Sequence, residues 1–248
     1  QSTLEERGVT VHTSSKVEAV ERNSEGVTVH SGGRQFPAEL FIVAAGIAPE
    51  TELAQKAGAE LGANGAIRVN RRMETSLPHV YACGDCAVAP HMVNREEVYI
   101  PLGTTANKQG KIAGKNAAGG EEEFAGVLGT MITKAFDTEY AKTGLGETEA
   151  QRHYTADAVT IKSRCRAGYY PGAGRIMLKL IFEKGSGRLL GAEAAGCEVK
   201  ARIDTLAVAA AEEMDMERLS QMDLAYAPPF SPVWDPVLVA ANVAKKKV

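Results

Sequence analysis

Alternating and continuous apolar segments divide the first part of the chain into predicted strands. Apolar and polar residues alternate over 9–20 and 26–30, and a polar break at Asn23-Ser24-Glu25-Gly26 predicts a β-hairpin. Residues 31–34, Ser-Gly-Gly-Arg, predict a second turn. The apolar run Leu-Phe-Ile-Val-Ala at 40–44 predicts a buried strand that ends in a Gly/Pro turn. We therefore expect a small hairpin sheet followed by one strand of a buried sheet.

A second apolar strand leads into a glycine turn that carries one acid. Residues 80–82, Val-Tyr-Ala, precede Cys-Gly-Asp-Cys at 83–86. Ligands of open α/β sheets bind at the carboxyl ends of strands, so Asp85 is placed to hydrogen-bond a sugar or sugar-alcohol hydroxyl. Downstream, Pro101 is a helix start signal, and small residues at helical spacing follow through residue 116. Such a helix can lie close to a neighbour or a ligand. Shorter elements are predicted as a helix at 52–57 and a strand at 66–69.

The second half of the chain has the pattern of an α+β domain. An acidic run at 121–123 marks its beginning. The turn Gly185-Ser186-Gly187 predicts a hairpin. Helices are predicted over 199–214 and 217–222. Strands are predicted at 131–136, 140–145, 153–161, 175–182 and 189–195.

Composition and charge exclude several classes of function. The 248 residues, 44% of them hydrophobic, suffice for one large or two modest domains. A net charge of −3 argues against binding to nucleic acid or a membrane surface, and the basic tail at 245–247 is short enough to be a solvated end. No apolar run reaches the length of a membrane span, and no secretory signal opens the chain. Four cysteines do not make a disulfide scaffold, so we expect a cytoplasmic protein.

The cysteine pair at 83–86 has two further interpretations. A CxxC motif is typical of a redox dithiol or of half a zinc site. Zinc needs further ligands, and Cys165 and Cys197 are single and far apart in the sequence, so we expect no metal. The dithiol stays open. The preceding strand and the position of Asp85 favour packing roles for Cys83 and Cys86.

In this context the motifs resemble the second flavin-binding segment of the pyridine nucleotide–disulfide oxidoreductases. Residues 75–82 match the family's segment before the Gly-Asp turn, and the helix after Pro101 matches the one at the flavin. The resemblance implies that Asp85 binds the ribityl chain of FAD and that the helix amino end faces the flavin ring. The implied cofactor-binding residues are Gly46, Pro49, Gly84, Asp85, Pro101, Leu102, Gly103 and Thr104.

The resemblance covers nearly the whole chain and implies three parts. Residues 1–38 resemble the end of an NAD(P)H-binding domain, 39–120 the carboxyl-terminal part of an FAD-binding domain, and 121–248 a dimerisation domain. The expected fold class is an incomplete α/β flavin- and nucleotide-binding portion followed by an α+β domain that forms a homodimer. Because the chain opens on Gln1 and a helix end capped by Gly8, we expect a longer protein. Its first flavin loop, nicotinamide loop and redox cysteine would precede Gln1.

Three segments resemble one branch, the coenzyme A-disulfide reductases with the related NADH oxidases and sulfur or persulfide reductases. They are residues 168–172, residues 226–231 and the helix start around Asn107. In the coenzyme A-disulfide reductases, tyrosines matching Tyr169 and Tyr226 approach the redox cysteine of the partner subunit, where a phenol can donate to a thiolate. Packing at an interface is the alternative for both tyrosines. Asn107 replaces a frequent substrate-contacting histidine, which leaves the preferred disulfide open.

Three other side chains have candidate surface roles. Trp234 is expected to anchor an interface rather than to act in catalysis. Arg164 and Arg166 are expected to face solvent, with a pyrophosphate group as the alternative partner.

The resemblance implies an FAD-dependent NAD(P)H oxidoreductase. It would pass electrons through the cysteine before Gln1 to a small-molecule substrate, which is coenzyme A disulfide, a persulfide or a polysulfide, with coenzyme A as substrate or ligand. The alternatives are an NADH oxidase or peroxidase of the same fold, and a non-catalytic dimerisation module if this chain acts alone. The electron acceptor and the choice between NADH and NADPH stay open.

Overall fold

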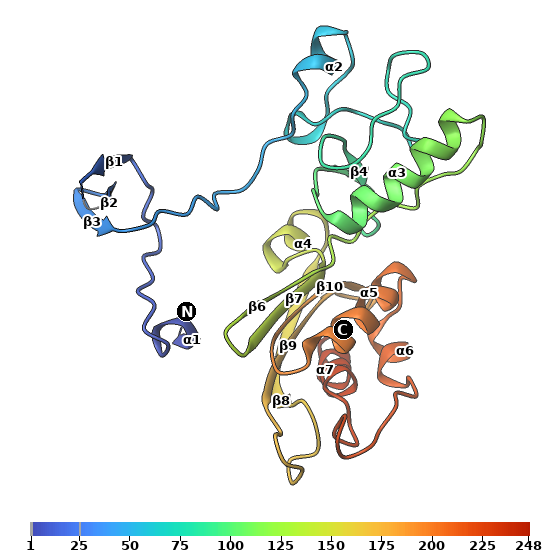
Figure 1. Ribbon diagram of the computed structural model, residues 1–248. Helices are drawn as coiled ribbons and strands as arrows, with labels where there is room; N and C mark the ends of the chain where they lie inside the picture. Colours follow the sequence, from blue (N-terminus) through green and yellow to red (C-terminus); the bar gives the residue numbers. More distant parts are fainter. Residues whose placement is uncertain (1, 25) are drawn as a thin grey trace. The chain divides into compact units, whose positions relative to one another are not determined.

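The computed structural model, which describes residues 2–24 and 26–248, forms two units, residues 1–47 and residues 48–248 (Figure 1). The first unit contains helix α1 (Ser2–Glu5) and a three-stranded antiparallel sheet. Its strands, in the order β1-β2-β3, are β1 (Ala19–Asn23), β2 (Gly26–Ser31) and β3 (Arg34–Ala38).

Both predicted turns of this sheet join strands that pair. Asn23 pairs with Gly26 across the first turn, of which Glu25 lies outside the described residues. At the second turn Gly32 and Gly33 have φ of 56° and 72°, a left-handed pair that suits a two-residue hairpin. The predicted helix end before Gly8 is also confirmed, with φ of 81° at the glycine. The alternation from residue 9 produces a strand only from Ala19 onward.

The prediction of a buried strand at 40–44 is wrong. These residues have no regular structure, and Leu40, Ile42 and Val43 are 74%, 75% and 73% exposed. A strand forms only where neighbouring strands satisfy its N–H and C=O groups, and no strand described in the structure pairs with this run. The apolar sequence is therefore present without the sheet that would bury it.

The second unit begins with a segment of short elements. They are α2 (Glu52–Lys56), the 3₁₀ turn η1 (Ala63–Gly65), the paired strands β4 (Ala89–Pro90) and β5 (Glu97–Val98), and the long helix α3 (Gly103–Ala117). The helices predicted near 52 and 101 are confirmed. The strands predicted at 66–69 and 80–82 are reduced to isolated bridges, two at Ile67 and one at Tyr81.

The rest of the second unit is a five-stranded antiparallel sheet in the order β6-β7-β10-β9-β8. Every predicted strand of this domain is found with small shifts at its ends, and so is the hairpin between the last two. The strands are β6 (Met131–Ala135), β7 (Thr138–Gly144), β8 (Ala156–Arg164), β9 (Arg175–Glu183) and β10 (Leu189–Gly196). The predicted α+β character is confirmed.

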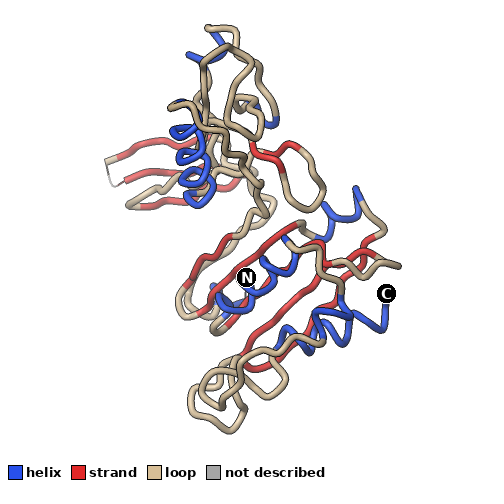
Figure 2. Tube along the Cα trace, turned by 90° about the vertical axis from the view of Figure 1, so that its right-hand side faces the viewer, coloured by secondary structure: helices blue, strands red, loops and turns tan. Residues whose placement is uncertain are grey.

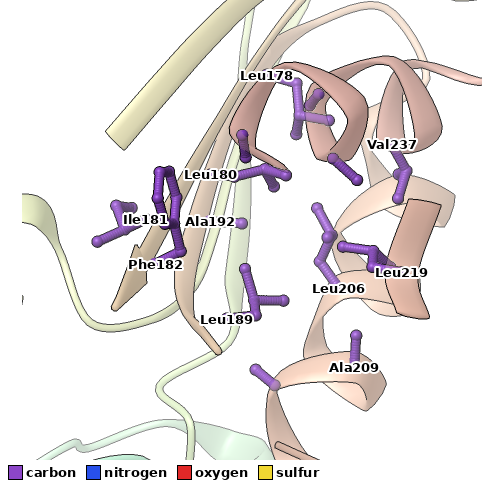
Figure 3. Packing of buried hydrophobic residues seen from close by; sticks show 14 of the residues in the cluster. Leu178, Leu180, Ile181, Phe182, Leu189, Ala192, Leu206, Ala209, Leu219 and Val237 are labelled. Carbon is purple, nitrogen blue, oxygen red and sulfur yellow. The ribbon is translucent and has the colours of Figure 1, made fainter. Parts of the chain in front are cut away.

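Helices cover one face of this sheet (Figures 1 and 2). They are α5 (Val199–Ala211), α6 (Met216–Ser220) and α7 (Pro236–Ala244), followed by a 3₁₀ turn, η2 (Lys245–Lys247). Figure 3 shows Leu178, Leu180 and Leu189 of the strands facing Leu206, Leu219 and Val237 of the helices. Helices α7 and α4 (Glu147–His153) were not predicted from the sequence. No helix in the described part of the chain is long and apolar enough to cross a membrane.

His91 is a buried titratable group between β4 and the segment before β6. It is 3% exposed, and its backbone forms a bridge with Val127. Its Nδ1 accepts the Val93 N–H at 3.2 Å, while the ring donates to the Leu128 carbonyl. Burial lowers the pKa of His91, and protonation of Nδ1 would also break the bond from Val93. The folded chain therefore favours neutral His91.

We expect the free energy of unfolding to fall as pH decreases below about 6.5, because the unfolded chain then binds a proton that folded His91 does not. The decrease ends at the lower pKa of the folded state. His91→Gln, which keeps a donor and an acceptor but does not titrate, should remove this part of the slope. Urea unfolding between about pH 5 and about pH 7.5 measures it. The matched control is His12→Gln at an exposed position. A slope unchanged in His91→Gln would contradict the assignment.

Candidate functional site

The glycine turn at 83–86 is fixed against the first turns of α3. The Gly84 N–H donates to Gln109 Oε1 at 2.8 Å, and Gln109 Nε2 donates to the Val88 carbonyl at 2.9 Å. Gln109 is fully buried, so both bonds are shielded from water. Gly84 has φ of 81°, and a Cβ there would lie 3.5 Å from the Ala106 side chain. The structure therefore brings the predicted turn and the predicted helix start together.

Asp85 is held by its backbone and leaves its carboxylate exposed. The Tyr99 hydroxyl donates to the Asp85 carbonyl at 2.8 Å, and burial raises the pKa of Tyr99, which keeps that hydroxyl a donor. Within residues 2–24 and 26–248 no group donates a hydrogen bond to the Asp85 carboxylate. This arrangement presents an acceptor for hydroxyl groups of a ligand.

The amino end of α3 offers donors next to this turn. Its N-cap is Leu102, which has an extended backbone and no side chain able to cap, and Pro101 precedes it. The carbonyl of the N-cap, Leu102, accepts the first hydrogen bond of the helix, from the Ala106 N–H at 2.9 Å. The N–H groups of the first turn, including those of Gly103 and Thr104, therefore lack intrahelical acceptors. Together with the helix dipole they favour an electron-rich ligand group.

The remaining predicted ligand residues have different positions. Asn107 lies on the exposed side of α3, opposite the buried side chains of Thr105 and Gln109. Gly46, with φ of 89°, lies in the 1–47 unit, while Pro49 lies in the other unit. The roles expected for Gly46 and Pro49 rest on the resemblance alone.

Tyr169 and Tyr226 come together from two loops. Tyr169 lies in the loop 165–174 between β8 and β9, and Tyr226 lies between α6 and α7. The interaction of the Tyr226 hydroxyl with the Tyr169 side chain raises the pKa of Tyr226, which keeps Tyr226 protonated at neutral pH. The rings are 78% and 45% exposed. A second bond, from the Ala167 N–H to the Pro228 carbonyl at 3.2 Å, joins the loops.

A buried ion pair that the sequence reading missed holds both loops. Arg202 of α5 is 6% exposed, and its Nη2 lies 3.0 Å from Asp235 Oδ2. The same Nη2 donates to the Cys165 carbonyl at 2.9 Å and to the Phe230 carbonyl at 3.1 Å. Each of these carbonyls belongs to one of the two tyrosine loops. The signal in the sequence is a charged residue beside Ile203 on the apolar face of a predicted helix.

Asp235 connects the same pair to α7. Its Oδ1 accepts the Val237 N–H at 2.9 Å as the N-cap of that helix, and its Oδ2 accepts the Ser231 hydroxyl at 2.9 Å. Trp234, immediately before it, is 60% exposed. The Asp-Pro sequence at 235–236 is a helix start signal that could have predicted α7.

The cysteines fall into two sets. Cys83 packs on the apolar cluster around Met73, Cys86 packs on that around Ile67, and burial raises the pKa of Cys83, so their packing role is confirmed. By contrast, Cys165 and Cys197 are far apart in the sequence but not in space, because their Sγ atoms lie 2.7 Å from each other, so treating them as single cysteines was wrong. Strand register joins them across residues that are distant in the sequence.

The expectation for the two arginines is half correct. Arg164 is exposed and donates to the Ala173 carbonyl at 3.0 Å. Arg166 does not simply face solvent, since it is half-buried and forms an ion pair with Glu198.

Two family models match the chain. One, described as pyridine nucleotide-disulphide oxidoreductase, matches residues 1–110, and the other, its dimerisation domain, matches residues 130–236. These matches agree with the predicted fold class, a nucleotide- and flavin-binding portion followed by a dimerisation domain.

Curated relatives and a solved structure are similar to the chain. A Pyrococcus furiosus protein named NAD(P)H sulfur oxidoreductase (CoA-dependent) is 43% identical over 231 residues, 93% of this chain and 52% of the relative. A Methanocaldococcus jannaschii NADH oxidase is 37% identical over 250 residues, 100% of this chain and 55% of the relative. A NAD-dependent persulfide reductase from A. fulgidus has a TM-score of 0.95 and 43% identity, covering 99% of this chain and 46% of its own. The chain thus spans about half the length of the relatives it matches.

Proposed function

The chain belongs to the pyridine nucleotide-disulphide oxidoreductase family, and on this premise we propose that it is the carboxyl-terminal part of an FAD-dependent NAD(P)H oxidoreductase that reduces coenzyme A disulfide, a persulfide or a polysulfide. The observation that carries the proposal is the meeting of the loops of Tyr169 and Tyr226, which Arg202 and the bond from Ala167 to Pro228 hold together. The names of relatives support it, since one is a CoA-dependent sulfur oxidoreductase and another, from Staphylococcus haemolyticus, is a coenzyme A disulfide reductase at 31% identity over 201 residues.

The turn at Gly84 and Asp85 and the amino end of α3 fit a flavin cofactor. In this proposal the exposed Asp85 carboxylate accepts hydrogen bonds from the ribityl hydroxyls. The N–H groups at Gly103 and Thr104 donate to the acceptor edge of the ring system, and Gly84 keeps the backbone close. When bound, FAD would accept a hydride from NAD(P)H and pass the electrons on to sulfur.

The two tyrosines act on the sulfur side of the reaction. With a raised pKa, Tyr226 stays protonated at neutral pH and can donate to a thiolate or to a leaving sulfur. In this proposal Tyr169, which interacts with Tyr226, orients that hydroxyl. The redox cysteine itself belongs, in this proposal, to the segment before Gln1. Asn107 is the candidate substrate contact on the exposed side of α3.

An oxidase is the second candidate function. The Methanocaldococcus jannaschii relative, which matches all of this chain, is named NADH oxidase. The same site residues would serve if the electrons passed to oxygen instead of to a disulfide. A non-catalytic dimerisation module is the remaining alternative for the chain acting alone, and a protein without bound flavin would favour it.

The proposal includes three domain parts and a location. We assign residues 1–38 to the end of the NAD(P)H-binding domain, 39–120 to the FAD-binding domain and 121–248 to the dimerisation domain. We place the protein in the cytoplasm, where thiols stay reduced.

The homodimer is proposed to form around the tyrosines. Phe230, Val233 and Trp234 are 71%, 67% and 60% exposed, and they lie in the same loop as Tyr226. Large exposed aromatic groups close together are typical of interface anchors. A partner seated on this loop would meet Tyr169 and Tyr226 at the subunit boundary.

The first prediction concerns the flavin. In the complete protein, Asp85→Ala should lower FAD affinity by about tenfold or more, the value of one hydrogen bond to a charged group. Cys86→Ser, one residue away, is the matched control and should retain FAD. Absorbance of bound flavin after gel filtration measures both. Equal retention in the two variants would remove Asp85 from the site.

The second prediction tests the reaction. Tyr226→Phe should lower kcat with coenzyme A disulfide by about ten- to a hundredfold, because one hydrogen bond to a charged sulfur is lost. FAD content should stay unchanged. Tyr170→Phe, in the neighbouring loop, is the control. NAD(P)H oxidation is followed with coenzyme A disulfide, polysulfide or oxygen as acceptor, and turnover with oxygen alone would favour the oxidase.

The third prediction concerns the interface. Trp234→Ala should raise the dimer dissociation constant by about thirtyfold or more, as expected for a buried aromatic anchor. Met131→Glu, which places a charge on the open face of the sheet where Met131 is 42% exposed and lies opposite Lys142, should leave the dimer intact. Analytical ultracentrifugation compares the two. The opposite result would move the interface from the tyrosine loops to the sheet.

A further inference from the structure

Cys165 and Cys197 meet at one end of the five-stranded sheet. Cys165 follows β8 and Cys197 follows β10, the two strands that flank β9. The Cys165 N–H donates to the Gly174 carbonyl at 3.0 Å, and the Cys197 N–H donates to the Arg175 carbonyl at 2.9 Å. The ladder therefore fixes both cysteines beside the first residues of β9.

Gly174 makes the meeting of the two sulfur atoms possible. A Cβ at this position would lie 2.7 Å from Cys197 Cβ and 3.5 Å from Cys165 Sγ. Side chains on strands two apart are ordinarily separated by the side chain of the strand between them. With glycine there, the two Sγ atoms approach to 2.7 Å. This is below the separation of about 3.5–4 Å that suits unbonded heavy atoms, and it lies between that separation and the disulfide length of about 2.05 Å.

We propose that Cys165 and Cys197 are a redox-sensitive pair that closes to a disulfide and thereby ties the base of the tyrosine loop 165–174 to the start of α5. Cys197 lies directly before Glu198, the N-cap of α5. Cys165 is the first residue of the loop that carries Tyr169. The bond adds a covalent tie where Arg202 already holds the Cys165 carbonyl. It does not depend on the electron acceptor of the enzyme.

The exposure of the two cysteines determines which of them reacts first with an oxidant. Cys165 is fully buried, whereas Cys197 is partly exposed. The oxidant is a low-molecular-weight disulfide, R–S–S–R. The Cys197 thiolate attacks one of its sulfurs, forms Cys197–S–S–R and releases RS⁻. Cys165 then loses its proton and attacks the Cys197 sulfur, which forms the internal disulfide and releases the second RS⁻. Two cysteine thiols are oxidised, one small disulfide is reduced, and the two protons end on the released thiols.

Cys197 is held in its protonated form at neutral pH. Burial, followed by the hydrogen bond with Cys165, raises the pKa of Cys197 to about 11. The Glu198 carboxylate acts in the same direction, whereas Arg166 opposes it. Arg202 faces the carbonyl of Cys165 rather than its sulfur. Since the thiolate is the attacking species, oxidation should speed up as pH rises toward that value.

A metal is the competing occupant of this cluster. Ligand atoms of Cys165, Cys197 and Glu198 lie within 4.8 Å of one another. Two thiolates on one tetrahedral zinc, at about 2.3 Å each, would stand about 3.8 Å apart. The sulfur separation here is 2.7 Å, and Glu198 is already paired with Arg166. The geometry therefore favours the disulfide.

The experiment is oxidation of the complete protein by oxidised glutathione. Non-reducing peptide mapping should recover one peptide that joins Cys165 to Cys197, and the rate should rise about tenfold per pH unit between about pH 7 and about pH 9. A Cys83→Ser, Cys86→Ser double variant should link equally well. Gly174→Ala, which places a methyl group 3.0 Å from Cys197 Sγ and 3.5 Å from Cys165 Sγ, should slow linking at least tenfold. Limited trypsin cleavage after Arg166 should be slower in the oxidised protein.

Two results would overturn the proposal. One is a folded protein in which Cys197 is glutathionylated without ever linking to Cys165. The other is one equivalent of zinc bound to the reduced protein, removed by Cys197→Ser and protecting both thiols from oxidation. Neither readout uses catalytic activity, so failure here is separate from failure of the proposed reductase function.

Discussion

The buried ion pair between Arg202 and Asp235 is the constraint on which the tyrosine site depends. Arg202 donates to carbonyls of two loops, and Asp235 caps α7 while binding the Arg202 guanidinium. Loss of one partner would leave an uncompensated buried charge, which costs about 3–5 kcal/mol. Replacement of both partners by apolar groups often leaves the free energy of unfolding unchanged. The role of such a pair is therefore to position the groups that it binds rather than to stabilise the fold. Here it fixes where two loops leave the domain.

In the proposed flavin site, a neutral buried side chain, Gln109, has the positioning role that the ion pair has in the tyrosine site. Gln109 is buried in α3 and bonds both to Gly84 and to the Val88 carbonyl. The apolar clusters in this part of the chain, around Met73 and Ile67, are smaller than the core beneath α5 and α7. With less apolar burial to fix positions, a shielded amide has more influence on the turn that presents Asp85. Both sites are thus positioned by one buried polar side chain with several bonds.

Elements that depend on interactions between residues close in the sequence were predicted correctly, and those that depend on distant residues were not. The antiparallel strands β6 to β10 depend on local alternation and glycine turns, and they were found. The run at 40–44 has the composition of a buried strand, but its burial depends on neighbours that residues 1–47 do not supply. Helix α4 escaped because its sequence, Glu-Thr-Glu-Ala-Gln-Arg-His, buries only Ala150 and so has no apolar periodicity.

The same limit explains the site residues that were missed. Tyr169 and Tyr226 were chosen through resemblance, whereas their hydrogen bond exists because Arg202 holds the bases of both loops. Cys165 and Cys197 appeared unrelated because 32 residues separate them, yet the register of β8, β9 and β10 requires them to meet over a glycine. A contact of this kind can be inferred only after the strand order is known, since neither residue has a local signal.

One loop therefore joins three kinds of interaction. At its base, residue 165 receives a hydrogen bond from Arg202 and brings its sulfur to Cys197, and near its tip Tyr169 interacts with Tyr226. The ion pair is permanent, the sulfur contact is changed by oxidation, and the phenol contact is exposed at the surface. The Ala167 bond to Pro228 and the ion pair of Arg166 with Glu198 also attach this loop, and a covalent tie at its base would further limit the positions open to Tyr169. The redox state of a buried cysteine pair would in this way reach a tyrosine that has no contact with either sulfur.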